Sequence, residues 1–207
     1  MSKLIAIERG FPRENYKGEK NLATKENTYC NGENRLFYLS DDVDNSSIGQ
    51  LCWSLLFQLQ DDDKKEAKEK DFVREPIKLY INSYGGSVYD MWALIDIILN
   101  SKTPIYTYCT GYAMSAAFKI FLAGHKRFAT KHSTFMYHQM SSWKHGKYQD
   151  LVEDRKQDDY LQKTIEEYVM DRTKLTQADM DDIREKKKDF YIHPKDALKW
   201  GIVNEII

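Results

Sequence analysis

Two neighbouring segments of the chain each place a strand pattern, a glycine junction and a helix pattern in direct succession. In "KLYINSYGGSVYDMWALIDIILN", isoleucine and leucine alternate with other residues at 77–81, and Gly85 and Gly86 precede a helical run. In "TPIYTYCTGYAMSAAFKIFLAG", a second strand pattern ends at Gly111, and Gly124 marks the expected helix end. Consecutive strand–turn–helix units need crossover connections, so they predict an α/β fold built on a parallel sheet.

The rest of the chain extends this order of elements. Further strands are expected at 34–40, 133–139 and 202–207, and further helices at 46–60, 148–174, 176–187 and 193–201. A serine or threonine before a helical run indicates its N-cap, and the candidates are Ser46 or Ser47, Ser87 and Thr176. The charged run "DDDKKEAKEKDFVRE" after residue 60 is typical of a solvated helix end followed by a loop.

Composition excludes several functional classes. Of 207 residues, 42% are apolar and 30% charged, and the formal net charge is -1. These values are typical of a soluble globular protein with no general affinity for nucleic acid or anionic membranes. Cys30, Cys52 and Cys109 show no CxxC spacing and favour reduced thiols, and no apolar run is long enough to span a bilayer. We therefore expect a cytoplasmic protein without a nucleic-acid or membrane partner.

The sequence also lacks the common motifs for cofactors and metals. It contains neither GxGxxG nor GxxxxGK[ST], the loops that bind dinucleotides and nucleoside triphosphates. Its five histidines form no HxH or HExxH pattern. We expect neither a cofactor nor a metal site.

Three positions carry candidate chemistry, and each has a structural alternative. Paired glycines at 85–86 would leave backbone N–H groups at a helix start open to an anion or an oxyanion, or they form only a tight turn. Ser115 is expected in the first turn of its helix among small alanines, as an accessible nucleophile or as a small residue in a close helix contact. His138 ends a strand, where an imidazole serves as a base or has only a structural role.

Together these motifs resemble the proteolytic subunit of Clp protease. "KLYINSYGGSV" is similar to that family's strand and oxyanion loop, and "GYAMSAAF" to its nucleophile helix. "AGHKRFATKHSTFMYHQ" is similar to the stretch that leads to its catalytic histidine, and "DFYIHPKDALKWGIVNEI" to its C-terminal segment. The resemblance begins at Asn34 and implies a ClpP/crotonase-like fold of repeated β-β-α units with a parallel sheet. It also implies one peptidase domain at 34–207, with a protruding long helix, the handle, at about 140–175. The resemblance does not cover residues 1–33, where the polar, mixed sequence predicts an N-terminal arm.

The same resemblance implies a Ser-His-Asp triad. Ser115 takes the place of the nucleophile, His138 that of the base, and Asp189 that of the carboxylate. The backbone N–H groups of Gly86 and Ala116 are implied as the oxyanion hole. The order of the three residues along the chain is unlike that of the best-known triads, but a triad is defined by its geometry.

The function implied is that of an ATP-dependent Clp-type serine endopeptidase subunit, which cleaves unfolded proteins fed into an oligomeric chamber. The implied partners are further copies of the chain in a heptameric ring, with or without ring pairing, and a separate AAA+ unfoldase ATPase. The implied substrates are proteins or peptides. Three alternatives remain open: a phage or mobile-element maturation protease of the same fold, a non-catalytic ring subunit, and a crotonase-like acyl-CoA enzyme.

The chain departs from the family pattern in several places. Tyr84 replaces the usual proline of the glycine loop, Ala116 the usual methionine, and Lys188 an arginine that couples ring contacts to the active site. After His138, "QMSSWKHGKYQD" replaces a proline and a glycine-rich strand that binds substrate and joins rings, and the charged run after residue 60 resembles a small insertion. We therefore expect altered substrate preference, and weak ring pairing because the lysines of the replaced strand would repel their symmetry mates.

Overall fold

A mixed sheet forms the centre of the fold. The computed structural model describes residues 28–32, 34–186 and 189–207. Within them the sheet contains eight strands: β1 (Thr28–Asn31), β2 (Leu36–Leu39), β3 (Ile77–Ser83), β4 (Ile105–Met114), β5 (Lys126–Ala129), β6 (Thr134–Tyr137), β7 (Phe190–Ile192) and β8 (Glu205–Ile206). Strands β2, β3, β4, β5 and β8 are parallel neighbours in that order, and β6 pairs in parallel with β4. The predicted α/β fold with a parallel sheet is confirmed, and antiparallel pairs β1–β2 and β6–β7 extend it.

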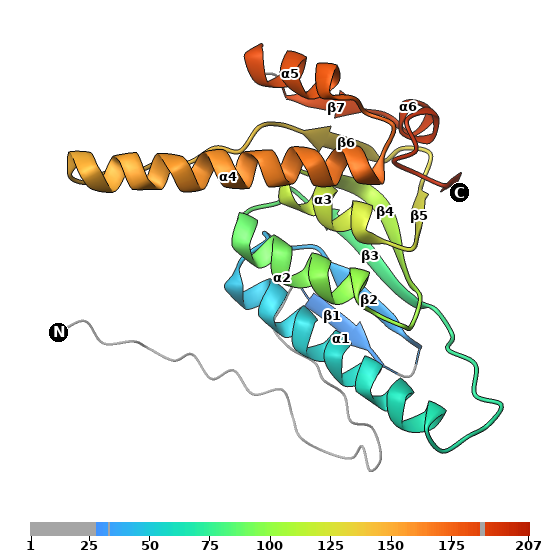
Figure 1. Cartoon of the computed structure of the whole chain (residues 1–207). Coiled ribbons are helices and arrows are strands. Elements are labelled where there is room, and N and C mark those ends of the chain that lie inside the picture. Colours follow the sequence, from blue (N-terminus) through green and yellow to red (C-terminus); the bar gives the residue numbers. More distant parts are fainter. Residues whose placement is uncertain (1–27, 33, 187–188) are drawn as a thin grey trace, which may run out of the picture.

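Helices pack around this sheet, and α1 to α4 cover one of its faces. They are α1 (Asn45–Glu66), α2 (Val88–Leu99), α3 (Ala116–Ala123), α4 (Tyr148–Arg172), α5 (Gln177–Glu185) and α6 (Pro194–Lys199). Figure 1 shows α1, α2, α3 and α4 side by side in front of the strands, and the start of α4 projects well beyond the body. Among the helices of the described residues, none is both long and apolar enough to cross a membrane.

Alternation along the strands explains why α1 to α4 cover only one face. Leu79 and Ile81 of β3 are fully buried beneath them. The residues between point to the other face, where the ring of Tyr108 stacks on Tyr80 and on Phe128, with centroids 4.7 Å apart in both pairs. Because burial of one aliphatic side chain contributes about 1.5–3 kcal/mol, a slip of one residue in register would be strongly unfavourable.

Helix α1 differs from its prediction at both ends. Its N-cap is Asp44, whose Oδ1 accepts hydrogen bonds from the N–H groups of Ser46 and Ser47, so the predicted serine N-cap was wrong. Ser47 is instead the reciprocal partner at the third helical position. The helix also continues through the first part of the charged run. There Asp62 is fully buried in a bidentate ion pair with Arg35, at 2.8 Å, so the run is not uniformly solvated as predicted.

Periodicity did not reveal strands β5 and β7. They contain four and three residues, KRFA and FYI, and neither sequence alternates apolar with polar residues. Strand β1 falls within the range 1–33 that was assigned to the N-terminal arm, so the sheet begins earlier than the proposed domain boundary. The remainder of that arm, 1–27 and 33, lies outside the described residues. The N-caps predicted at Ser87 and Thr176 are confirmed.

Candidate active site

Ser115 occupies a strained turn between β4 and α3. Strand β4 continues to Met114, three residues beyond its predicted end at Gly111, and Ser115 is the N-cap of α3 rather than a residue of its first turn. Its backbone has φ 53° and ψ -120°, which side chains with a Cβ rarely adopt. The Ser115 N–H donates to the carbonyl of Met136 on β6 at 2.9 Å and so holds the turn in place. Strained strand-to-helix turns of this kind expose a nucleophile above the sheet.

The glycine loop after β3 lies directly against this turn. Gly85 and Gly86 have φ of 103° and 149°, so both use conformations that favour glycine. A Cβ on Gly85 would lie 2.6 Å from the Met114 carbonyl oxygen and 2.7 Å from the Ala116 nitrogen. A Cβ on Gly86 would lie 2.3 Å from the Val43 carbonyl oxygen. Glycine is therefore required at both positions because backbone atoms occupy the space that a side chain would need.

Two backbone N–H groups beside Ser115 have no acceptor. Val43 bridges the glycine loop: its N–H donates to the Gly85 carbonyl and its carbonyl accepts from the Ser87 N–H. The Gly86 N–H takes part in neither hydrogen bond. The Ala116 N–H begins α3 and precedes the first intrahelical hydrogen bond. In the described part of the chain neither N–H donates a hydrogen bond. Both could donate to an oxyanion, with the positive end of the α3 dipole behind one of them.

His138 lies within hydrogen-bonding distance of Ser115. Strand β6 is parallel to β4, with Met114 opposite Met136, so the residue that follows β6 lies beside the Ser115 turn. The Nε2 atom of the half-buried His138 is 2.8 Å from Ser115 Oγ. In the neutral ring, an unprotonated Nε2 accepts the Ser115 hydroxyl proton, as a general base must.

The environment of His138 favours the neutral imidazole. Burial lowers its pKa below the ordinary value, and the charge of Lys119 acts in the same direction. A hydrogen bond to the backbone of Gln139 and the carboxylate of Asp189 oppose this shift. The net direction is downward, so at neutral pH His138 is a free base that can accept a proton.

Asp189 lies across from His138 without a hydrogen bond to it in the described structure. Strand β7 is antiparallel to β6, with Tyr137 opposite Phe190, and this register places Asp189 next to His138. Both residues line a cavity of about 470 Å³. Asp189 is exposed, and among the described residues no hydrogen bond joins it to His138. The structure thus brings Ser115 and His138 into contact and leaves Asp189 close to them but unbonded.

The segment 139–147 contacts α4 along its length, and its first four residues, 139–142, line this cavity. The Met140 N–H donates to Gln162 Oε1 at 2.7 Å, and Ser142 Oγ donates to Asp158 Oδ2 at 2.7 Å. Lys144 forms ion pairs with Asp154 and Asp158 at 3.2 and 3.6 Å. The segment is therefore held by side chains of α4 and forms no strand. The charge of Lys144 is therefore compensated within its own chain. Repulsion between Lys144 and its symmetry mate is then weaker than the prediction of weak ring pairing assumed.

The structure bears on the other substitutions and on one residue that the sequence analysis missed. The ring of Tyr84 contacts that of Tyr112 with centroids 4.3 Å apart, which supports the glycine loop where the family has proline. Lys188 lies outside the described residues.

The sequence analysis overlooked Lys119, a buried lysine in α3. The signal was a single charged residue in an otherwise uncharged helix. Within the described residues no group of three or more histidine, cysteine or acidic side chains could hold a metal ion.

Comparisons with known proteins agree on one family. The family model described as Clp protease matches residues 32–207. An ATP-dependent Clp protease proteolytic subunit of Deinococcus radiodurans is 33% identical over 135 residues, covering 64% of this chain and 65% of that one. Proteolytic subunit 1 of a Prochlorococcus marinus strain is 31% identical over 175 residues, covering 83% of each chain. The solved structure of a ClpP1 point mutant from Listeria monocytogenes matches with a TM-score of 0.71 at 22% identity, covering 85% of this chain and 92% of that one, which supports the fold.

Proposed function

The chain belongs to the Clp protease family, and we propose that it is a serine endopeptidase subunit whose triad is Ser115, His138 and Asp189. The single observation that carries the proposal is the 2.8 Å contact between Ser115 Oγ and His138 Nε2 at a strained nucleophile turn. A small residue in a close helix contact would not need a left-handed backbone, nor a histidine at hydrogen-bonding distance.

In the proposed reaction, Ser115 Oγ attacks the carbonyl carbon of the scissile peptide bond. His138 Nε2 takes the hydroxyl proton, and the carbonyl oxygen gains a negative charge that the Gly86 and Ala116 N–H groups stabilise. The protonated His138 then gives its proton to the leaving amine, which leaves an acyl ester on Ser115. Water deprotonated by His138 hydrolyses that ester and restores the serine.

Asp189 supports His138 in this scheme. A carboxylate beside the ring orients it and stabilises the imidazolium that forms during proton transfer. The exposed position of Asp189 requires a small closing movement toward His138 before it can accept a hydrogen bond from the ring. Hydrogen bonds of catalytic groups are commonly longer in a substrate-free site and tighten when substrate is bound.

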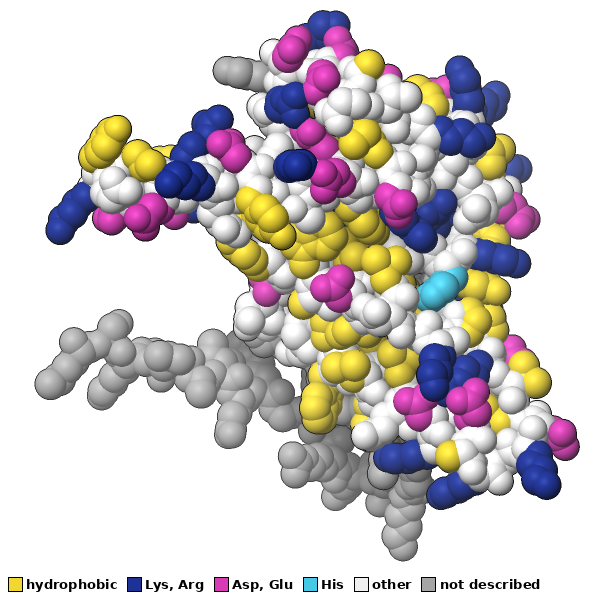
Figure 2. Space-filling view, viewed as in Figure 1, with side chains coloured by type: hydrophobic (Ala, Val, Ile, Leu, Met, Phe, Trp, Pro, Cys, Tyr) yellow, Lys and Arg dark blue, Asp and Glu magenta, His cyan; other side chains and the backbone are white. Residues whose placement is uncertain are grey.

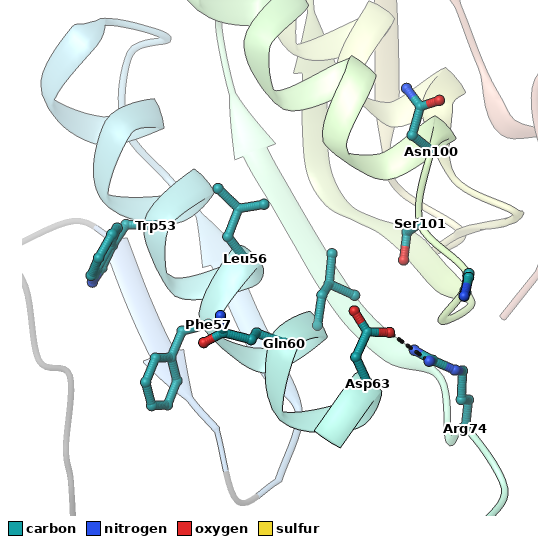
Figure 3. Close-up of a pocket in the computed structure, with 10 residues that line it drawn as sticks. Trp53, Leu56, Phe57, Gln60, Asp63, Arg74, Asn100 and Ser101 are labelled. Atoms are coloured by element: carbon teal, nitrogen blue, oxygen red, sulfur yellow. Dashed lines mark hydrogen bonds and ion pairs between the residues drawn. The ribbon is translucent and has the colours of Figure 1, made fainter. Parts of the chain in front are cut away.

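Assembly into a ring with a separate ATPase is a further part of the proposal. The matched relatives are named as ATP-dependent Clp protease proteolytic subunits, which supports an ATPase partner for this chain. A groove of about 520 Å³ lies away from Ser115, between α1 and the residues after α2, and Figure 3 shows its lining. Trp53, Leu56 and Phe57 line it with exposed fractions of 64%, 48% and 45%. Exposed apolar groups of this size mark association surfaces, and we assign this one to contacts between copies of the chain in a heptameric ring.

The test combines particle mass with substrate size. Native mass spectrometry of the purified chain should give a multiple of seven subunits. The same sample should hydrolyse a short fluorogenic peptide without ATP and leave a stably folded protein intact, because a chamber admits only small or unfolded chains. Digestion of the folded protein by the purified chain alone would contradict the chamber. A particle that forms but never hydrolyses any peptide would favour the non-catalytic ring subunit.

A further inference from the structure

Lys119 is a buried charge on the helix that follows Ser115, and it lies against the residue that precedes His138. It lies one turn after Ser115 on α3, and its N–H donates to the Ser115 carbonyl at 3.4 Å. All eight residues of α3 are buried, and Lys119 is 4% exposed. Its Nζ lies 4.9 Å from the ring centroid of Tyr137, the residue immediately before His138. The lysine side chain thus reaches from the nucleophile's helix to the strand that carries the base.

The surroundings of Lys119 offer no carboxylate partner. Within the described residues its ammonium forms neither an ion pair nor a hydrogen bond. From α4, Tyr168 donates to the Lys119 backbone carbonyl at 3.0 Å, and the buried Glu166 is already paired with Arg184 at 2.8 Å. The residues that α2 buries are Met91, Leu94, Ile95 and Ile98, all of them apolar. A buried lysine is costly without a partner, so its presence here calls for a functional reason.

We propose that Lys119 is a positioning residue for His138. The buried amine of Lys119 disfavours the imidazolium form of His138 and thereby extends the pH range in which His138 is a free base. The inference rests on the proposed function, because only a catalytic base benefits from this effect. The contact with the Tyr137 ring fixes where the amine lies, since a cation is attracted to the face of an aromatic ring. Lys119 touches no reacting atom and acts only through His138.

The order in which the two groups titrate gives the effect its sign. Burial lowers the pKa of Lys119 to about 7, whereas the pKa of His138 lies below its ordinary value of 6.5. While His138 titrates, Lys119 therefore still carries most of its charge and opposes a second cation beside it. The groups that face His138 are Lys119 from α3, Asp189 before β7, Asp158, Asp159 and Arg155 from α4, and Arg184 from α5. Replacing Lys119 by a neutral residue should raise the pKa of His138.

Diethyl pyrocarbonate provides a direct readout, because it modifies the neutral imidazole and not the imidazolium. The rate of His138 modification would be followed by peptide mass spectrometry between about pH 5 and pH 8, in the full-length wild type and in variants. Lys119→Met should raise the midpoint of this titration by about one pH unit. Lys119→Gln is a second neutral variant, and Lys119→Arg keeps the charge and should not raise the midpoint. Lys126→Met is the matched control, since Lys126 lies 5.5 Å from the centroid of the Tyr106 ring but is exposed on β5.

An equal midpoint in the wild type and in folded Lys119→Met and Lys119→Gln would overturn the inference. In active protein, the acid limb of the pH profile of kcat/KM should move to higher pH by the same amount in these variants. The two proposals fail separately: a wild type without peptidase activity would count against the proposed function, whereas the modification midpoint of His138 tests Lys119 whether or not the protein is active.

Discussion

The two halves of the candidate site are held in place by different parts of the protein. The serine half consists of Gly85, Gly86, Ser115 and Ala116, and it is fixed mainly by backbone contacts. Its φ values lie between 53° and 149° at three of these positions, and any added Cβ on the glycines would collide with main-chain atoms. The histidine half, His138 and Asp189 with the segment 139–147, depends on side chains of α4 and includes an exposed carboxylate.

This contrast indicates where rigidity and where adjustment reside. A backbone-fixed oxyanion site and nucleophile need no rearrangement when charge develops on the substrate. Side-chain contacts at partly exposed positions are weaker and can re-form, so the histidine half can close when substrate is bound. Figure 2 shows basic, acidic and hydrophobic side chains together on the projecting start of α4, the helix that holds segment 139–147.

The largest effect is expected at the serine itself. Ser115→Ala removes the proposed nucleophile and should lower the rate of peptide hydrolysis by about 10⁴-fold or more. The measurement is kcat/KM on a short fluorogenic peptide. Ser141→Ala is the matched control, because Ser141 is an exposed serine that lines the cavity beside His138. Residual activity of Ser115→Ala near that of Ser141→Ala would move the chemistry to another residue.

The next largest effect is expected at Asp189, which tests the histidine half. Asp189→Asn preserves the size of the side chain but removes the charge that stabilises the imidazolium, and kcat should fall by roughly 10⁴-fold. Asp159→Asn, which alters a carboxylate lining the same cavity, should leave kcat within a few-fold. If Asp189→Asn retained a tenth or more of the wild-type kcat, the carboxylate would have no part in the triad.

A substitution at Gly86 tests the serine half through its backbone. Gly86→Ala places a Cβ 2.3 Å from the Val43 carbonyl oxygen, so the loop must shift and its N–H must leave the oxyanion position. Loss of one oxyanion donor typically lowers kcat by about 10²–10³-fold. Gly49→Ala is the control, because a Cβ there meets nothing within 4 Å. A Gly86→Ala protein with normal kcat would show that this loop is not part of the reaction.

The smallest effect is expected from the loss of one of the side-chain contacts that hold the segment 139–147. Gln162→Leu removes the acceptor for the Met140 N–H, a hydrogen bond of 2.7 Å. One such bond contributes about 1 kcal/mol, so we expect roughly a five- to tenfold rise in KM with little change in kcat. Gln157→Leu, five residues earlier on α4, loses only an exposed hydrogen bond to Tyr89 and serves as the control. Equal KM values in both variants would show that the segment does not depend on Gln162.

The strand–turn–helix order of the serine half could be predicted from the sequence, because glycines and alternating strand residues are local signals of turns and strands. Gly85, Gly86 and Ser115 were identified from such patterns, and the Ser87 N-cap from its position before a helical run. The strain at Ser115 was not predictable, since β4 runs three residues past Gly111 where β3 and β6 pair with it. Local pattern places a residue near a helix start, whereas the neighbouring strand decides its φ.

Features that depend on distant parts of the chain escaped the sequence analysis. Asp62 looked like one of many solvated charges, and only the fold brings Arg35 to it from a separate strand end. The hydrogen bonds and ion pairs between segment 139–147 and α4 likewise join residues up to 22 positions apart. The separation between Asp189 and His138 depends on the register of β6 and β7, two strands more than fifty residues apart in the sequence.

Labelling with a fluorophosphonate probe tests the central claim most directly, namely that His138 activates Ser115. The Ser115 oxygen would attack phosphorus and displace fluoride, and peptide mass spectrometry would locate the adduct without any need for a substrate, an ATPase or a ring. We predict an adduct on Ser115 in the wild type, none in Ser115→Ala, and labelling at least about a hundredfold slower in His138→Ala, the lower end expected for loss of a general base. An adduct on another residue, or equally fast labelling of Ser115 in the wild type and in His138→Ala, would contradict the account.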